Sequence, residues 1–333
     1  MGMQVNLNAP QPPRWLSGGA WGGHAQSIAP SLFSHKPACA WARQRWEWDD
    51  GDFCDADWLH TKSPSAPLLV LFHGLESSSN SHYARSIGAH FLSQGWRVVV
   101  PHFRGCSGEP NRLLRAYHSG DAAEIGRMLG KAQAAFPHAP LHAAGVSLGG
   151  NALLCYLSQN HLPTALKSAA AVCAPLDLGR CGDAITQGFA HVYTLMFMRT
   201  LRTKALAKQV LFPNACDWAG IRRSRNLFEF DGVFTAPIHG YQSALDYYAR
   251  ASAKPKLATI DTPTLLLNAL NDPFVPRDIV ADLAVSPRVT VQHTQQGGHV
   301  GFAQQSAQGG LFGQLNWLPQ RLHAWFTHDA LGA

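Results

Sequence analysis

The feature that most constrains the fold of this chain is Gly145-Val-Ser-Leu-Gly149, in which Ser147 lies between two glycines. The apolar run Pro140–Val146 before it predicts a buried strand, and Asn151–Leu157 behind it predicts a helix. So sharp a turn from strand to helix nearly brings the residues two before and two after the serine into contact, so only glycine-sized residues fit there. The serine hydroxyl is lifted out of the sheet, in front of the free N–H groups of the helix N-terminus. The stretch predicts a nucleophilic serine and requires a base, an acid and an oxyanion donor elsewhere.

Composition indicates a large globular protein. The chain has 333 residues, of which 46% are hydrophobic and 14% charged, enough for one α/β domain with an inserted second lobe. The net charge of +6 is not gathered into a dense basic patch, so we expect no nucleic-acid partner. The phosphate-binding and dinucleotide glycine motifs are missing, as is zinc-ligand spacing of His and Cys. We therefore expect no cofactor and no metal.

Seven cysteines are widely spaced, without any C-x-x-C pair, which is typical of reduced thiols. The first ten residues lack the basic and apolar regions of a secretory signal. No stretch approaches the roughly 18 uninterrupted apolar residues of a membrane-spanning helix. These features predict a cytoplasmic location.

Short apolar runs alternate with helical stretches along most of the chain. A β-hairpin is expected within residues 40–61, around the turn dipeptide Asp50-Gly51. Further strands are expected at Leu68–Phe72, Trp96–Val100, Pro140–Val146, Ala169–Cys173, Thr264–Asn268 and Val289–His293. This alternation predicts an α/β fold with a mostly parallel central sheet and helices on both of its faces.

The alternation stops between Leu178 and about Lys256, where the sequence is a mixture of helical and loop segments. We interpret this region as a helical lid inserted above the sheet, because lids arise at the carboxyl edge of the strands. Ordinary extra helices beside the core are the alternative. The predicted division is a surface-wrapping segment 1–38, a first core part 39–180, the lid 181–255 and a second core part 256–333.

The candidate base is His299, in the glycine-rich segment Gln296–Phe302 that follows the last predicted strand. A glycine-rich loop allows the imidazole to reach over a nucleophile. Two other histidines compete with it. Both His293 and His142 lie inside predicted strands, where packing is the simpler interpretation.

The candidate acid is Asp272, just past the predicted strand Thr264–Asn268. Its carboxylate would accept the Nδ1–H of His299, fix the tautomer and stabilise the imidazolium. An Asp-Pro turn is the structural alternative. Asp177, after the preceding strand, is the second candidate for the acid.

Oxyanion donors are expected to be backbone N–H groups. One is that of Leu148, which follows the nucleophile. The other is expected in the loop His73-Gly-Leu-Glu76, where Leu75 is the predicted donor and Gly74 permits close approach of the main chain. Losing one such donor typically removes about 3 kcal/mol of transition-state stabilisation.

With these elements in place, the chain resembles the YheT-like family of α/β hydrolases, which is related to the eukaryotic ABHD esterases and lipases. The resemblance spans nearly the whole chain, and the string from His102 to Asn111 is its most specific part. Other matching segments are Trp15-Leu with His24-Ala-Gln26, His73–Ser79, Tyr117–Gly120, Gly145–Asn151, Phe230-Asp231 with Thr235-Ala-Pro237, Asp272–Pro276 and Gly297–Phe302.

The resemblance implies the α/β-hydrolase fold and places Ser147, Asp272 and His299 at the family's triad positions. Two residues depart from the family pattern. Ser77 replaces a glycine often seen in the first loop, and Asn271 replaces a frequent second aspartate, which leaves Asp272 as the carboxylate at that strand end.

Charged residues suggest two further hypotheses. Arg104, Glu109 and Arg112 line the substrate entrance or, as the favoured alternative, form a structural ion-pair network. In the predicted lid, the apolar run Val192–Met198 is followed by the four basic residues Arg199, Arg202, Lys204 and Lys208. An apolar face beside a basic face predicts transient contact with an anionic membrane surface, whereas a solvated amphipathic helix is the favoured alternative.

Together these features predict a serine carboxyl-ester hydrolase that works through an acyl-enzyme on a small-molecule ester, with lipid-derived esters as one candidate class. Acyl transfer to an alcohol or thiol would use the same three residues. A non-catalytic binding protein that retains the fold is the alternative from a different class. The sequence indicates neither the acyl-chain length nor the oligomeric state.

Overall fold

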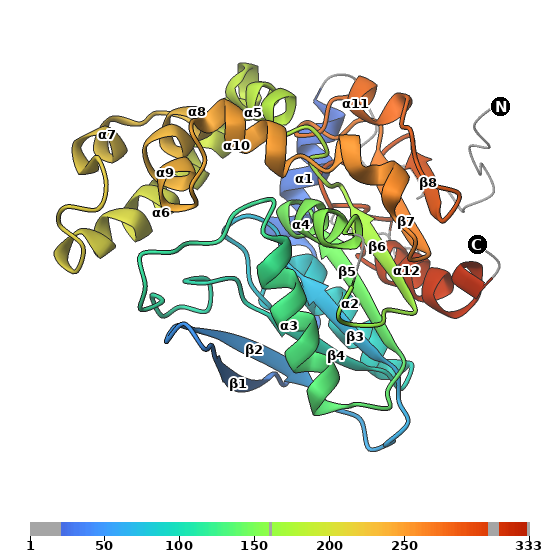
Figure 1. Cartoon of the computed structure of the whole chain (residues 1–333). Coiled ribbons are helices and arrows are strands. Elements are labelled where there is room, and N and C mark those ends of the chain that lie inside the picture. Colours follow the sequence, from blue (N-terminus) through green and yellow to red (C-terminus); the bar gives the residue numbers. More distant parts are fainter. Residues whose placement is uncertain (1–20, 160–161, 306–312, 332–333) are drawn as a thin grey trace.

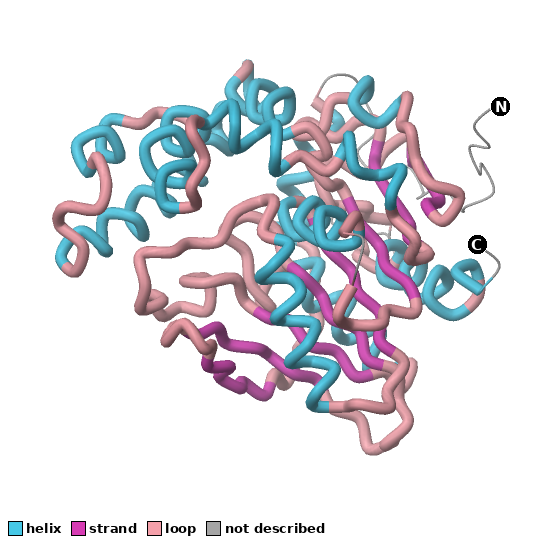
Figure 2. Tube along the Cα trace, viewed as in Figure 1, coloured by secondary structure: helices cyan, strands magenta, loops and turns pink. Residues whose placement is uncertain are grey.

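The computed structural model describes residues 21–159, 162–305 and 313–331. Eight strands in these ranges form one sheet in the order β1-β2-β4-β3-β5-β6-β7-β8 (Figures 1 and 2). Their bounds are β1 Ala42–Glu47, β2 Phe53–Leu59, β3 Leu68–Phe72, β4 Arg97–Pro101, β5 Leu141–Val146, β6 Ser168–Val172, β7 Thr264–Ala269 and β8 Val289–Thr294. β2 pairs antiparallel with both β1 and β4, and all other neighbours are parallel. The predicted mostly parallel sheet and its N-terminal hairpin are therefore confirmed.

Helices cover both faces of the sheet (Figure 1). α3 (Ala122–Ala135) and α4 (Leu148–Leu157) pack on one face, and α2 (His82–Ser93) and α12 (Trp317–Thr327) on the other. Successive residues of β3 enter opposite layers: Leu68, Val70 and Phe72 pack with α3 and α4, whereas Leu69 and Leu71 pack with α2 and α12. A strand buried on both faces needs apolar residues at every position, which is why these strands read as continuous apolar runs.

A helical insert, Leu178–Thr259, separates β6 from β7 and lies across the end of the sheet at which α4 begins (Figure 1). It has its own small core, in which Trp218 and Ile221 pack with Phe230 and Phe234. Its helices are α5 Leu178–Thr186, α6 His191–Ala207, α7 Trp218–Arg223, α8 Leu227–Phe230, α9 Ala236–Ile238 and α10 Ala244–Ala251, with 3-10 turns Gly188–Ala190, Lys208–Val210 and Lys254–Thr259 and a π-helical turn Asp231–Thr235.

The first twenty residues of the predicted surface-wrapping segment lie outside the described residues. The rest of that segment contains α1 (Gly22–Phe33), which does more than cover the surface, because Gln26 and Ser27 are buried. The remaining elements are α11 (Arg277–Ala281) and a 3-10 turn at Asp329–Leu331. In the described part of the chain, no helix has the length and apolar character needed to cross a membrane.

Candidate active site

Ser147 occupies a strained turn between β5 and α4. Its φ of 53° and ψ of −121° lie outside the regions that L-residues favour, a conformation that costs on the order of 1–3 kcal/mol and is often found at functional sites. A Cβ on Gly145 would lie 2.4 Å from the carbonyl oxygen of Gly149, and a Cβ on Gly149 would lie 2.5 Å from that of His73. Both glycines are therefore required by close backbone contacts, as predicted from the sequence.

The structure brings Ser147, His299 and Asp272 together. The Nε2 atom of His299 lies 2.9 Å from Ser147 Oγ, and its Nδ1 atom lies 2.9 Å and 3.1 Å from the two carboxylate oxygens of Asp272. In this arrangement Nδ1–H donates to Asp272 and Nε2 is free to accept the serine proton. The Asp272 side chain is buried and the His299 side chain is 12% exposed, so the pair is largely shielded from solvent but accessible from the cavity.

Two neighbours hold this pair in place. The ring of Phe274 stacks on His299 with centroids 4.1 Å apart and an interplanar angle of 16°. The backbone N–H of Phe274 also donates to Asp272 Oδ1 over 2.8 Å. Phe274 therefore fixes the orientation of both side chains at once.

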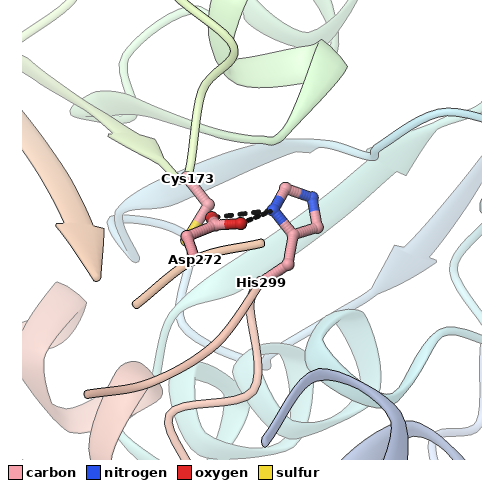
Figure 3. Close-up of side chains that lie close together, drawn as sticks. All are labelled: Cys173, Asp272 and His299. Carbon is pink, nitrogen blue, oxygen red and sulfur yellow. Dashed lines mark hydrogen bonds and ion pairs between the residues drawn. The ribbon is translucent and has the colours of Figure 1, made fainter. Parts of the chain in front are cut away.

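Cys173, at the end of β6, lies against the carboxylate of Asp272 (Figure 3). Ligand atoms of Cys173, Asp272 and His299 all lie within 4.8 Å of one another. Burial, with the Asp272 charge nearby, raises the pKa of the Cys173 thiol well above its usual range. A metal ion would need the thiolate and would compete for the Asp272 and His299 atoms that already bind each other, so this donor set does not fit a metal centre.

The loop after β3 presents the predicted second oxyanion donor. Within the described residues, neither the N–H of Leu75 nor that of Leu148 donates to another protein atom. A Cβ on Gly74 would lie 3.2 Å from that of Ser147, which places this loop against Ser147. Both predicted N–H groups therefore remain available to a substrate oxygen beside Ser147.

Hydrogen bonds from side chains shape that loop. The N–H of Gly74 donates to Tyr83 Oη over 2.9 Å, and Tyr83 Oη donates to Ser77 Oγ over 2.8 Å. Ser77, the departure from the family pattern, thus anchors the tyrosine that holds Gly74. His73 bonds to the carbonyl of Gly74 through Nδ1 and accepts the N–H of Phe103 at Nε2. Burial lowers the pKa of His73 to about 3, so its imidazole is neutral and this pattern persists at neutral pH.

α1 supports the loop that carries His299, a role that the sequence did not predict. The N–H of His299 donates to Ser27 Oγ over 2.7 Å. Gln26 Oε1 accepts both the N–H of Gly297, over 3.0 Å, and the Nδ2–H of Asn271, over 2.8 Å. Asn271 Oδ1 in turn accepts the N–H of Gly298 over 3.0 Å. Asn271 therefore links α1 to the His299 loop, and an aspartate there would lack the amide donor.

The other candidates have structural partners. Asp177 caps α5 by accepting the N–H of Arg180 over 3.1 Å. His142 lies in β5, 2.9 Å from Ser168 Oγ, and burial lowers its pKa to about 4. His293 lies in β8. Asp272 rather than Asp177 lies beside His299.

A cavity of about 470 Å³ opens beside Ser147 and His299, and residues of the insert line its far side. Arg104 and Glu109 contribute to the lining and also form ion pairs. Arg104 contacts Asp50, Asp52 and Glu124, Glu109 contacts Arg45, and Arg112 contacts Glu47. The predicted ion-pair network is therefore present.

The basic residues after Val192–Met198 do not form one exposed basic face. Lys204 reaches inward to Glu76, with Nζ 2.9 Å from Oε2, and Lys208 is buried and donates to Asn111 Oδ1 over 2.8 Å. The guanidinium of Arg202 donates to the carbonyl oxygens of Met198 and Ser224. The expectation of a basic face is therefore wrong for Lys208, which is buried, and for Arg202, which is half-buried against backbone carbonyls, whereas Arg199 and Lys204 are exposed.

Comparisons with known proteins agree with the observed fold. Residues 67–305 match the family model described as alpha/beta hydrolase fold. The chain is 39% identical over 309 residues to "Putative esterase YheT" of Escherichia coli (strain K12), covering 91% of this chain and 90% of that protein. It is 27% identical to human "Phospholipase ABHD3", covering 85% of this chain and 71% of that protein. Among solved structures, the Pyrococcus furiosus esterase Pf2001 matches with a TM-score of 0.55 at 14% identity, covering 96% of each chain.

Proposed function

Because the chain belongs to the α/β hydrolase fold family, and within it to the YheT-like branch, we propose that it is a serine carboxyl-ester hydrolase whose nucleophile, base and acid are Ser147, His299 and Asp272. The observation that carries the proposal is the continuous contact from Asp272 through both ring nitrogens of His299 to Ser147 Oγ. The relatives named esterase and phospholipase support ester substrates.

In this mechanism Ser147 Oγ attacks the ester carbonyl carbon while His299 Nε2 takes the serine proton. The carbonyl oxygen becomes an oxyanion held by the N–H groups of Leu75 and Leu148. When the intermediate collapses, the bond to the alcohol oxygen breaks and His299 gives its proton to the leaving alcohol. A water, deprotonated by His299, then attacks the acyl-serine and releases the carboxylic acid and Ser147.

The helical insert acts as the lid of this site in our proposal, and the sheet segments before and after it form the core. Support comes from its position over the cavity, whose lining includes Phe197, Leu201 and Phe234 of the insert beside Ser147. An apolar lining suits an acyl chain. The ion pair between Lys204 of α6 and Glu76 of the oxyanion loop is a contact that opening of the lid would break.

We also propose that α6 contacts lipid surfaces through apolar side chains rather than through charge. Val192, Leu195 and Met196 are exposed on this helix, whereas Lys204 is paired with Glu76 and Lys208, just after the helix, is buried. Recovery with sedimented vesicles should be similar for neutral and anionic lipids, and Leu195→Asp should reduce both. No recovery with either lipid would refute lipid contact.

A fluorophosphonate probe tests the nucleophile directly. Labelling of the wild type and its loss in Ser147→Ala are expected, and an unlabelled wild type would favour a non-catalytic binding protein. A series of p-nitrophenyl esters from short to long acyl chains then measures hydrolysis. Added acceptor alcohols separate hydrolysis from acyl transfer, because a transferase would form the new ester in preference to the free acid.

A further inference from the structure

The cavity below the insert contains a carboxyl group, that of Asp231, whose charge has no ion-pair partner among the described residues. The charged side chains of the lining other than Asp231 have partners. These are Glu76 with Lys204, Glu109 with Arg45, Arg104 with Asp50, Asp52 and Glu124, and Lys208 with oxygen acceptors of Asn111 and Leu113. A carboxylate in such surroundings is unfavourable unless a cation or hydrogen-bond donors accompany it.

The backbone aims Asp231 at the cavity through an unusual turn. Asp231 begins the π-helical turn Asp231–Thr235 between α8 and α9, and it is only partly buried because it faces the cavity. π-Turns are rare and frequently occur at functional sites. Tyr248 Oη of α10 donates to Asp231 Oδ2 over 3.0 Å. Burial raises the pKa of Asp231 to about 6, while hydrogen bonds with Thr235 and Tyr248 oppose that rise. A cation bound beside the carboxyl group would favour its ionised form.

Aromatic side chains line the same cavity as this carboxylate. Phe230 precedes Asp231 and Phe234 follows it by three residues, with ring centroids 5.3 Å apart, and the rings of Tyr247 and Tyr248 lie 5.4 Å apart. Faces of aromatic rings attract organic cations, most strongly where water is excluded. A carboxylate among aromatic rings, without a protein cation of its own, is matched to an alkylammonium group and opposed to an anionic one.

We propose that Asp231 and these rings form a subsite for the alkylammonium end of an ester whose carbonyl lies at Ser147. That the ligand is an ester rests on the proposed function, whereas recognition of the cation does not. The segments Phe230-Asp231 and Thr235-Ala-Pro237 match the family pattern in the sequence but have no part in the hydrolytic mechanism. The subsite would explain their presence. The competing structural role, in which Asp231 merely anchors α10 through Tyr248, predicts no discrimination between cationic and neutral ligands.

Butyrylcholine and 3,3-dimethylbutyl butyrate provide a matched probe pair, since they differ by a quaternary nitrogen in place of a carbon. Calorimetric binding to Ser147→Ala, which does not depend on hydrolysis, should favour butyrylcholine by about tenfold, as an ion contact in a partly dry cavity implies. Asp231→Asn, which still accepts the Tyr248 hydrogen bond, should abolish that preference and leave binding of the neutral ester unchanged. Asp261→Asn, at an exposed aspartate outside the cavity lining, is the matched control and should retain the preference.

Equal binding of the two esters to Ser147→Ala would overturn the subsite without any further variant. Equal weakening of both esters by Asp231→Asn would assign Asp231 the structural role instead. If Asp231→Asn does not fold, Asp231→Glu, which keeps the charge, should retain a preference for the cation, and its loss would refute the proposal. A choline ester that binds but is not hydrolysed by the wild type would contradict the proposed function and leave the subsite standing.

Discussion

Replacing Gln26 with leucine tests whether α1 positions His299. Gln26 is buried, and its Oε1 atom accepts from the N–H of Gly297 and from Nδ2–H of Asn271. Leucine is similar in size and removes the one oxygen that accepts both hydrogen bonds. Each buried donor left unsatisfied costs about 1–3 kcal/mol, so the two together cost about 2–6 kcal/mol if the loop does not move.

The loop can relieve that cost by moving, and His299 would move with it. A misplacement of about 1 Å can reduce catalysis about 10²-fold. We therefore expect Gln26→Leu to lower kcat by about 10- to 100-fold and the free energy of unfolding by about 1–3 kcal/mol. KM should change little, because Gln26 does not line the cavity.

Rates of p-nitrophenyl butyrate hydrolysis, normalised to sites titrated with a fluorophosphonate, measure kcat for folded enzyme alone, and urea unfolding measures stability. Gln320→Leu, on the exposed side of α12, is the matched control. A variant that loses stability but keeps the wild-type kcat would refute the reasoning, because α1 would then stabilise the fold without positioning His299.

Three further outcomes follow from the site and its surroundings. Asp272→Asn should lower kcat about 10⁴-fold in the same assay, because an amide favours the wrong tautomer of the base; a loss below tenfold would contradict the assigned acid. Glu76→Gln removes the charge facing Lys204, whose side chain is 42% exposed, so the free energy of unfolding in urea should change by less than about 1 kcal/mol. The dependence of the hydrolysis rate on acyl-chain length should change, however, and an unchanged dependence would show that this ion pair does not hold α6 over the cavity. Burial lowers the pKa of His118 and of His239 to about 3, so between pH 6.5 and 3 the unfolded chain binds the protons that the native state excludes. The free energy of unfolding should then decrease as the pH is lowered, by up to about 1.4 kcal/mol per pH unit for each histidine. His239→Phe should reduce this dependence of the free energy of unfolding on pH, measured by urea unfolding from pH 6 to 4.

Much of the sheet and the candidate site follow from local sequence for a physical reason. Strands buried on both faces must be apolar throughout, so their runs are visible without knowledge of their neighbours. In a parallel sheet their carboxyl ends meet at one edge, so polar residues that directly follow such runs come together there. Ser147, Asp272 and His299 satisfy this condition, and the structure places them within hydrogen-bonding distance of one another.

The contacts missed by sequence reasoning join distant segments through side chains without a local pattern. Gln26 and Asn271, separated by 245 positions, bond to each other, and nothing in the composition of α1 indicates a partner in the His299 loop. The contacts of Lys204 and Lys208 with the core were missed for a similar reason. Whether Lys204 faces solvent or Glu76 depends on how the insert docks on the core, which helical periodicity alone does not specify.

The consecutive residues Leu75 and Glu76 connect the predicted oxyanion site to the insert. Leu75 offers its N–H beside Ser147, and the next residue, Glu76, binds Lys204 of α6. Glu76 also forms two hydrogen bonds with Tyr117: its N–H donates to Tyr117 Oη over 2.9 Å, and its Oε1 accepts the phenol proton over 2.8 Å. The partly exposed ion pair contributes about 0–1 kcal/mol, so it breaks more easily than the two hydrogen bonds together. Movement of α6 should therefore release Lys204 first and leave Tyr117 holding the loop, so that the oxyanion donors stay in place when the cavity opens to substrate.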